Sequence, residues 1–83
     1  MRKVALISAV LDNPQRCQRD FNDTIADYMY LIKGHMDVPL PEEGLSLVSL
    51  AVLGSIGDIN SLTNQLGKIE GVSVKTAMSK RDF

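Results

Sequence analysis

The chain has 83 residues, of which 45% are hydrophobic and 23% charged, and its formal net charge is −1. This balance is that of a globular protein, and it excludes a disordered chain or a collagen-like repeat. At this length we expect one domain, residues 1–83. A free-standing nucleic-acid-binding protein would carry an excess of basic residues, so we expect no direct nucleic-acid binding.

Cysteine usage and hydropathy indicate a cytoplasmic location. Cys17 is the only cysteine and cannot form an internal disulfide, which fits a reducing compartment. The apolar run 4–11 follows Arg2 and Lys3, but it is short for a signal peptide and precedes no small-residue cleavage site. No segment approaches the ~20 apolar residues that span a bilayer. We therefore expect a cytoplasmic protein without a membrane partner.

The first 26 residues predict a strand followed by a helix. Residues 4–11 are a short, continuous apolar run that ends at Asp12, which is typical of a strand buried on both faces. Asn13 suits the N-cap of a helix and Pro14 suits its first position. We expect this helix to extend to about Ala26. Its apolar face is formed by residues four apart, namely Cys17, Phe21 and Ile25.

The middle of the chain predicts two strands joined by a loop. Residues 28–36 combine aromatic and aliphatic residues with the polar Lys33 and His35, so we expect a strand that is more exposed than the first. Two prolines and a glycine predict a loop over residues 38–44. Residues 45–53 predict a third strand with apolar residues on both faces.

The last third predicts a helix and a strand. Ser55 is placed to cap the helix, with Asp58 returning a bond to the cap. Gly71 stands where a left-handed residue would end the helix. Residues 72–79 alternate between apolar and polar, which predicts a strand with one buried face. The apolar stripe of the helix consists of Ile59, Leu62, Leu66 and Ile69.

The order β-α-β-β-α-β predicts an α+β fold of the ferredoxin-like type, a four-stranded antiparallel sheet with both helices on one face. The first and third strands are central in this topology, and these are the two that are apolar on both faces. No element remains to cover the second face of the sheet, so we expect a homo-oligomer, a dimer or tetramer, formed through this open face. Either of two sets on the third strand would face outward: Leu45, Leu47, Ala51 and Leu53, or Val48, Leu50 and Val52.

Residues suited to catalysis or metal binding are few and scattered. Cys17 shares the apolar stripe of its helix and is best interpreted as a small buried hydrophobe. His35 is the only histidine and has no companion ligands at metal-site spacing. Glu42 and Glu43 lie in a predicted solvated loop, and no nucleophile and base can be paired. We expect no enzyme, no metal and no cofactor.

One candidate binding site remains, at the turn formed by Leu11, Asp12 and Asn13. The turn leads into a helix N-terminus, whose free N–H groups favour anions and polar ligands. The competing interpretation is that Asn13 simply caps the helix. Both interpretations stay open at this point.

The segment 66–76 resembles the L-G-x-I-x-G-V-x-V-K-T ending of small ACT-like proteins that are named as regulators of the iron-only hydrogenase system. Pro41-Glu42-Glu43-Gly44 and Lys33-Gly34 are also similar to that family. The resemblance implies an ACT-like domain that oligomerises and acts as a regulatory or sensor module, including in transcription. The same fold occurs in nickel-responsive repressors, whose metal site uses several histidines and a cysteine. This chain has one of each, so that site is not implied.

By resemblance, ACT-like modules bind small molecules near the turn between the first strand and the first helix, close to a subunit interface. Here that turn contains Leu11, Asp12 and Asn13. Asp12 disfavours a purely anionic ligand, so an amino acid fits better than phosphate. The predicted function is a ligand-sensing or partner-binding module linked to the hydrogenase system. The alternative is a small ferredoxin-like enzyme of the dimeric barrel type, which needs a polar cluster in the cavity of the open face.

Overall fold

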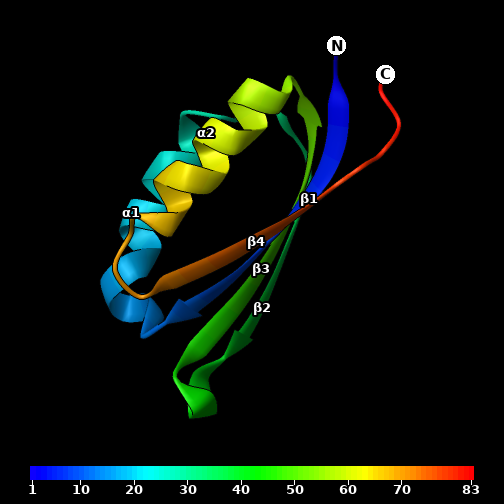
Figure 1. The fold of residues 1–83 in the computed structure, drawn as a ribbon. Coiled ribbons are helices and arrows are strands. Elements are labelled where there is room, and N and C mark those ends of the chain that lie inside the picture. The colour runs from blue at the N-terminus through cyan, green and yellow to red at the C-terminus, as the bar shows by residue number, and fades with distance from the viewer.

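The computed structural model describes residues 1–83 and has the predicted α+β, ferredoxin-like architecture (Figure 1). Its elements are β1 (Lys3–Asp12), α1 (Pro14–Ala26), β2 (Ile32–Leu40), a short 3-10 helix (Pro41–Glu43), β3 (Leu45–Gly54), α2 (Ile56–Gly67) and β4 (Val72–Met78). The strands form one antiparallel sheet in the order β2-β3-β1-β4, so the first and third strands are central as predicted. Neither helix is long and apolar enough to cross a membrane.

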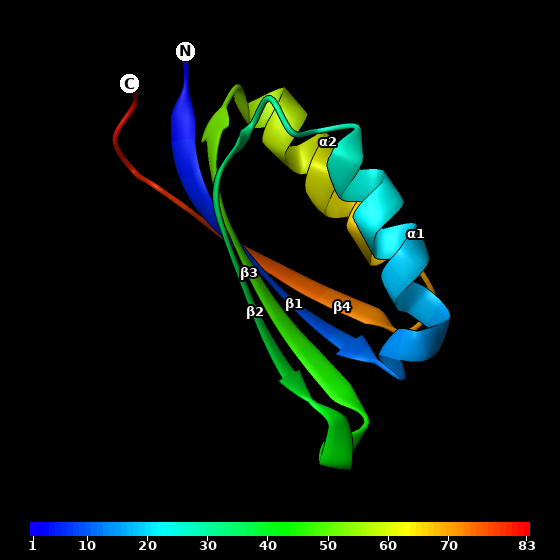
Figure 2. The ribbon, with the colours of Figure 1, turned by 180° about the vertical axis from the view of Figure 1, so that it is seen from behind.

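Both helices cover the same face of the sheet, and the opposite face is bare in both views (Figures 1 and 2). On β3, Val48, Leu50 and Val52 are buried beneath the helices. The alternating residues of that strand therefore form part of the uncovered face, which resolves the choice left open by the sequence. We call this uncovered surface the open face. Its apolar residues include Val4, Leu6, Val10, Val38, Leu47, Ala51 and Leu53.

The core lies between the sheet and the two helices and contains the predicted helical stripes except for Ile69, which follows the end of α2 at Gly67 and is only partly buried against the core. Its helical residues are Cys17, Phe21 and Ile25 from α1 and Ile59, Leu62 and Leu66 from α2. Each large side chain buried in this layer stabilises the fold by about 1.5–3 kcal/mol relative to exposure. A hydroxyl pair, Thr63 on α2 and Thr76 on β4 at 2.8 Å, connects a helix to the edge of the sheet.

The second strand differs from the prediction in its boundaries. Residues 28–31 form a turn, in which the N–H of Leu31 donates to the carbonyl of Tyr28 at 2.9 Å. The strand begins at Ile32 and continues through Leu40, across residues predicted as a loop. Pairing with β3 extends it, and Pro39 is tolerated because β2 is an edge strand that leaves some N–H positions without a partner.

Ser55 and Asn13 both occupy the N-cap positions predicted for them, and Pro14 begins α1, but only Ser55 makes a side-chain capping bond. The Ser55 hydroxyl accepts a hydrogen bond from the N–H of Asp58 at 3.1 Å, as a cap should, but no bond returns from the Asp58 side chain. Asn13 instead has a left-handed backbone (φ 58°) and its side chain makes no capping bond. The prediction of a side-chain cap at Asn13 was therefore wrong, and other constraints hold that residue.

Candidate functional site

The turn after β1 is fixed by two backbone hydrogen bonds to distant segments. The N–H of Asp12 donates to the carbonyl of Gly71 at 2.7 Å, and the N–H of Asn13 donates to the carbonyl of Gly44 at 2.9 Å. Asn13, Gly44 and Gly71 are the residues of the chain with positive φ. All three meet at this turn, although they come from three separate connections. Glycine adopts positive φ without strain, so Asn13 is the one residue of the three whose backbone conformation is uncommon for its type.

Gly71 has the predicted left-handed backbone, but it does not end the helix as predicted, because α2 ends at Gly67 with Lys68 as its C-cap. Gly71 is instead required at this turn, for two reasons. Its φ of +88° is one that residues with a side chain rarely adopt, and a Cβ at this position would lie 2.9 Å from the carbonyl oxygen of Asp12. The glycine therefore lets the connection between α2 and β4 approach the end of β1. Without that close approach, the hydrogen bond from Asp12 could not form in its present geometry.

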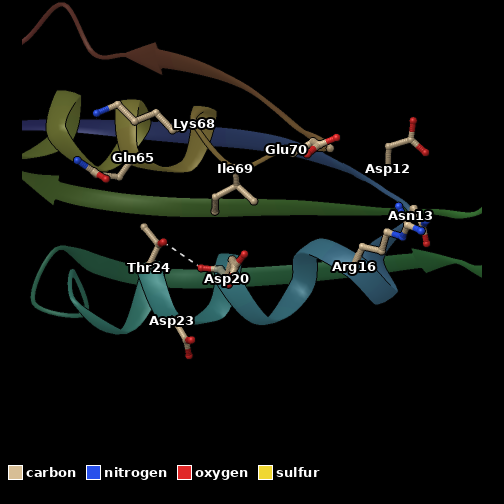
Figure 3. A pocket seen from close by; sticks show the side chains of 11 residues that line it. Asp12, Asn13, Arg16, Asp20, Asp23, Thr24, Gln65, Lys68, Ile69 and Glu70 are labelled. Carbon is tan, nitrogen blue, oxygen red and sulfur yellow. Dashed lines mark hydrogen bonds between the residues drawn. The ribbon is translucent and has the colours of Figure 1, made fainter.

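Beside the turn lies a polar cleft of about 760 Å³ between α1 and the C-terminal end of α2 (Figure 3). Figure 3 shows Asp12, Asn13 and Arg16 toward one end and Thr24, Gln65 and Lys68 toward the other. A single hydrophobic side chain, Ile69, contributes to the wall. The residues that line the cleft are Asp12, Asn13, Arg16, Asp20, Asp23, Thr24, Gln65, Lys68, Ile69, Glu70 and Gly71.

The cleft is lined by charged side chains of both signs that form no ion pairs with one another. It has four carboxylates and two basic groups, and none of them takes part in an ion pair within 4.0 Å. The two basic side chains come from different elements, Arg16 from α1 and Lys68 from the end of α2. An arrangement with separate positive and negative groups can bind a small molecule that itself carries both signs.

Cys17 lies behind the turn and is part of the core. Its Sγ is 3.7 Å from the carbonyl oxygen of Asp12 and 3.8 Å from that of Asn13. Burial raises the pKa of the Cys17 thiol above its usual value, so the thiol stays protonated near neutral pH. A protonated, enclosed thiol is a poor nucleophile, which supports a packing role for this residue.

The predicted site residues have different places in this arrangement. Asp12 and Asn13 line the cleft, whereas Leu11 is 1% exposed and packs in the core behind it. Sequence reasoning missed the remaining lining residues. Arg16 and Asp20 could have been found as a polar i, i+4 pair adjoining the apolar stripe of α1. The wall opposite them is built from 68–71, which belongs to the segment that carried the family resemblance.

Other candidate groups lie away from the cleft. His35 is on the edge strand β2 and contacts one carboxylate, that of Asp37, at 3.1 Å. Glu42 and Glu43 are exposed in the 3-10 helix. The structure gathers no group of three or more histidine, cysteine or carboxylate side chains that could hold a metal ion.

Comparisons with known proteins agree with the fold. A solved structure of an uncharacterised protein from Thermotoga maritima, TM1266, superposes with a TM-score of 0.92 at 24% sequence identity, covering 96% of this chain and 100% of the other. No curated protein matches the chain. Residues 3–76 match the family described as "TM1266-like: Iron-only hydrogenase system regulator, putative". The matched segment includes both walls of the cleft, and the chain belongs to this TM1266-like family.

Proposed function

We propose that this protein is a cytoplasmic regulatory module of the iron-only hydrogenase system that binds a zwitterionic small molecule, such as an amino acid, in the cleft beside Asp12. The carrying observation is the cleft itself, in which unpaired carboxylates and unpaired basic groups face a shared space next to the predicted turn. The family description supports a regulatory role.

The charges match the two ends of an amino acid. Asp12 and Glu70 both line the cleft and would accept hydrogen bonds from an ammonium group (Figure 3). Arg16, in the first turn of α1, would bind the carboxylate of the ligand through its guanidinium. The formal charge of the lining residues is negative overall, which disfavours phosphate and other anions without a donor group.

The proposed module works as a homo-oligomer. Leu6 and Met36, which lie on the open side of the sheet, are 52% and 60% exposed. Apolar residues gathered on one face usually mark an interface. The polar residues at the centre of that face are Ser8, Ser49 and Lys75. Because this set contains no carboxylate and no imidazole to act as a general acid or base, it disfavours the alternative of a dimeric barrel enzyme.

A thermal-shift screen of amino acids tests the ligand. A ligand that binds only the folded protein raises the melting temperature, and a concentration 100-fold above Kd adds about 2.7 kcal/mol of stability. We expect at least one amino acid to raise the melting temperature of the wild type. The increase should disappear in Asp12→Ala and in Arg16→Gln. The control is Glu42→Gln, which removes an exposed carboxylate outside the cleft.

Two results would contradict this proposal. The first is that no amino acid changes the melting temperature of the wild type. The second is a ligand whose full effect survives in both Asp12→Ala and Arg16→Gln, because it must then bind elsewhere.

A further inference from the structure

The residues of α1 that line the cleft follow one side of the helix. Arg16, Asp20 and Asp23 are spaced i, i+4 and i+7, and Thr24 follows at i+8, so they form a polar row beside the buried stripe of α1. At a rise of about 1.5 Å per residue, Asp20 lies about 6 Å further along the helix axis than Arg16. The cleft therefore has a positive group near the start of α1 and a negative group at a set distance beyond it.

Arg16 and Asp20 are both available to a ligand. Opposite charges four residues apart on a helix are close enough to interact, yet no ion pair within 4.0 Å joins these two side chains. The hydrogen bond drawn between Thr24 and Asp20 in Figure 3 uses the backbone carbonyl of Asp20, to which the Thr24 hydroxyl donates at 2.9 Å. The carboxylate of Asp20 thus has no partner within the chain.

The charges on α1 are placed against the dipole of the helix. Arg16 lies in the first turn and Asp23 in the last, and the first turn has no acidic residue and the last turn no basic one. Because a helix N-terminus favours negative charge and a C-terminus favours positive charge, this distribution does not stabilise the helix. For a ligand, however, the dipole and the side chains act in the same direction. A molecule with its carboxylate at the start of α1 and a cation further along would match both.

We propose that the ligand of the cleft is a basic amino acid, whose side chain carries a second positive charge, and that the carboxylate of Asp20 receives this charge. The inference rests on the proposed function and names the class of amino acid. The carboxylate of the ligand binds Arg16, and its α-ammonium group binds Asp12 and Glu70. Its side chain extends along α1, and the offset of about 6 Å between Arg16 and Asp20 suits the reach of lysine or arginine.

The total charge of the cleft favours this class of ligand. Four carboxylates and two basic groups line it, which gives a formal charge of −2. A neutral amino acid leaves this charge unchanged, whereas a basic amino acid compensates one of the two excess carboxylates. The negative field also attracts cationic ligands from solution. Lys68, the basic group on the opposite wall, does not oppose the contact, because its side chain extends away from Asp20 in Figure 3.

The one apolar residue of the cleft suits the methylene groups of such a side chain. Ile69 lies in the middle of the view in Figure 3 and points from the segment after α2 toward α1. The aliphatic stem of lysine or arginine can cover an apolar surface while its charged end contacts a carboxylate or water. A small amino acid would leave Ile69 uncovered, and an acidic one would bring a second carboxylate toward Asp20.

Isothermal titration with matched ligands tests the inference. Arginine and citrulline have nearly the same shape and differ in the charge of the side chain, and lysine and Nε-acetyllysine form a second pair with the same change of charge. We expect the charged member of at least one pair to bind about fivefold more tightly than the neutral one, which is the upper range for an exposed ion pair. The preference should shrink as the salt concentration is raised.

Asp20→Asn is the variant that identifies the residue. It should reduce the preference to less than about twofold and leave the affinity for the neutral member unchanged. Asp20 is exposed, and the melting temperature of the unliganded variant confirms that it folds. The matched control is Asp27→Asn, which makes the same change at the C-cap of α1, outside the cleft, and should keep the full preference.

The outcomes separate this inference from the proposed function. Equal affinities within both pairs of ligands, or a preference that survives intact in Asp20→Asn, would overturn the assignment of a basic amino acid to Asp20. Either result leaves a zwitterionic ligand in the cleft possible, provided that some amino acid binds. If no amino acid binds at all, both this inference and the proposed ligand are refuted.

Discussion

Gly71→Ala offers a sharp test of how the turn beside the cleft is built. Placing a residue with a side chain at φ +88° costs roughly 1–2 kcal/mol. The new Cβ would also lie 2.9 Å from the carbonyl oxygen of Asp12, so the backbone must move and the hydrogen bond from Asp12 to Gly71 must lengthen. A weakened hydrogen bond adds about 0.5–1.5 kcal/mol. We therefore expect Gly71→Ala to lower the free energy of unfolding by about 1.5–3.5 kcal/mol.

This loss should be visible in thermal and urea unfolding followed by circular dichroism. A domain of this size loses about 4–8 °C in melting temperature per kcal/mol, which predicts a decrease of roughly 6–28 °C. Gly57→Ala is the matched control, because a Cβ at Gly57 in the first turn of α2 meets nothing within 4 Å. That variant should be neutral or more stable by up to about 1 kcal/mol. If Gly71→Ala melts within about 2 °C of wild type, the argument from the left-handed backbone and the close approach is refuted.

Two further predictions concern the sheet and the core. Leu47→Asp should yield a folded chain that no longer self-associates, whereas Leu50→Asp should unfold the chain, because Leu50 is 1% exposed beneath the helices. Circular dichroism measures folding and sedimentation measures self-association, and equal effects of the two variants would contradict the assignment of the two faces. Because burial raises the pKa of the folded Cys17 thiol, the unfolded chain loses its proton first, so stability should fall as pH rises above the usual thiol range. Cys17→Ala should remove this component of the pH dependence, and an unchanged alkaline slope would show that other groups cause it.

The fold could be predicted because local patterns and topology agree. β1 and β3 are apolar on both faces, and they are the two central strands. The boundaries of β2 could not be predicted, since the aromatic residues 28–30 have strong strand propensity but are held in a turn. Pairing with β3 decides where β2 begins, and this contact between distant residues leaves no local signal.

The cleft was predictable only on one side. Asp12 and Asn13 follow from the position of the turn, because a helix must begin directly after it. Lys68 and Glu70 reach the same space through the packing of α1 against α2 and the glycine contact at residue 71. No periodic pattern in the sequence predicts either of these contacts. The resemblance marked the segment that contains both residues, but it did not indicate what they face.

Asn13 allows the two interpretations of the turn to be separated by experiment. Its backbone is left-handed, a conformation that asparagine and glycine adopt more readily than other residues. Its side chain makes no capping bond and lines the cleft. Asn13→Gly should therefore keep the turn, with stability within about 0.5 kcal/mol of wild type, because removing an N-cap side chain in favour of glycine costs only a few tenths. Asn13→Ala should lose about 1 kcal/mol or more through backbone strain.

The two Asn13 variants should differ in stability but not in their effect on ligand binding. If the Asn13 amide contacts the ligand, Asn13→Gly and Asn13→Ala should both reduce the thermal shift produced by a bound amino acid, although only the second is destabilised. A contact to one neutral hydrogen-bonding group contributes about 0.5–1.5 kcal/mol, so we expect affinity to fall by roughly 2- to 13-fold in each variant. Full affinity in Asn13→Gly would show that this side chain serves the backbone of the turn alone. The ligand would then depend on the charged groups, Asp12 and Arg16, that flank it.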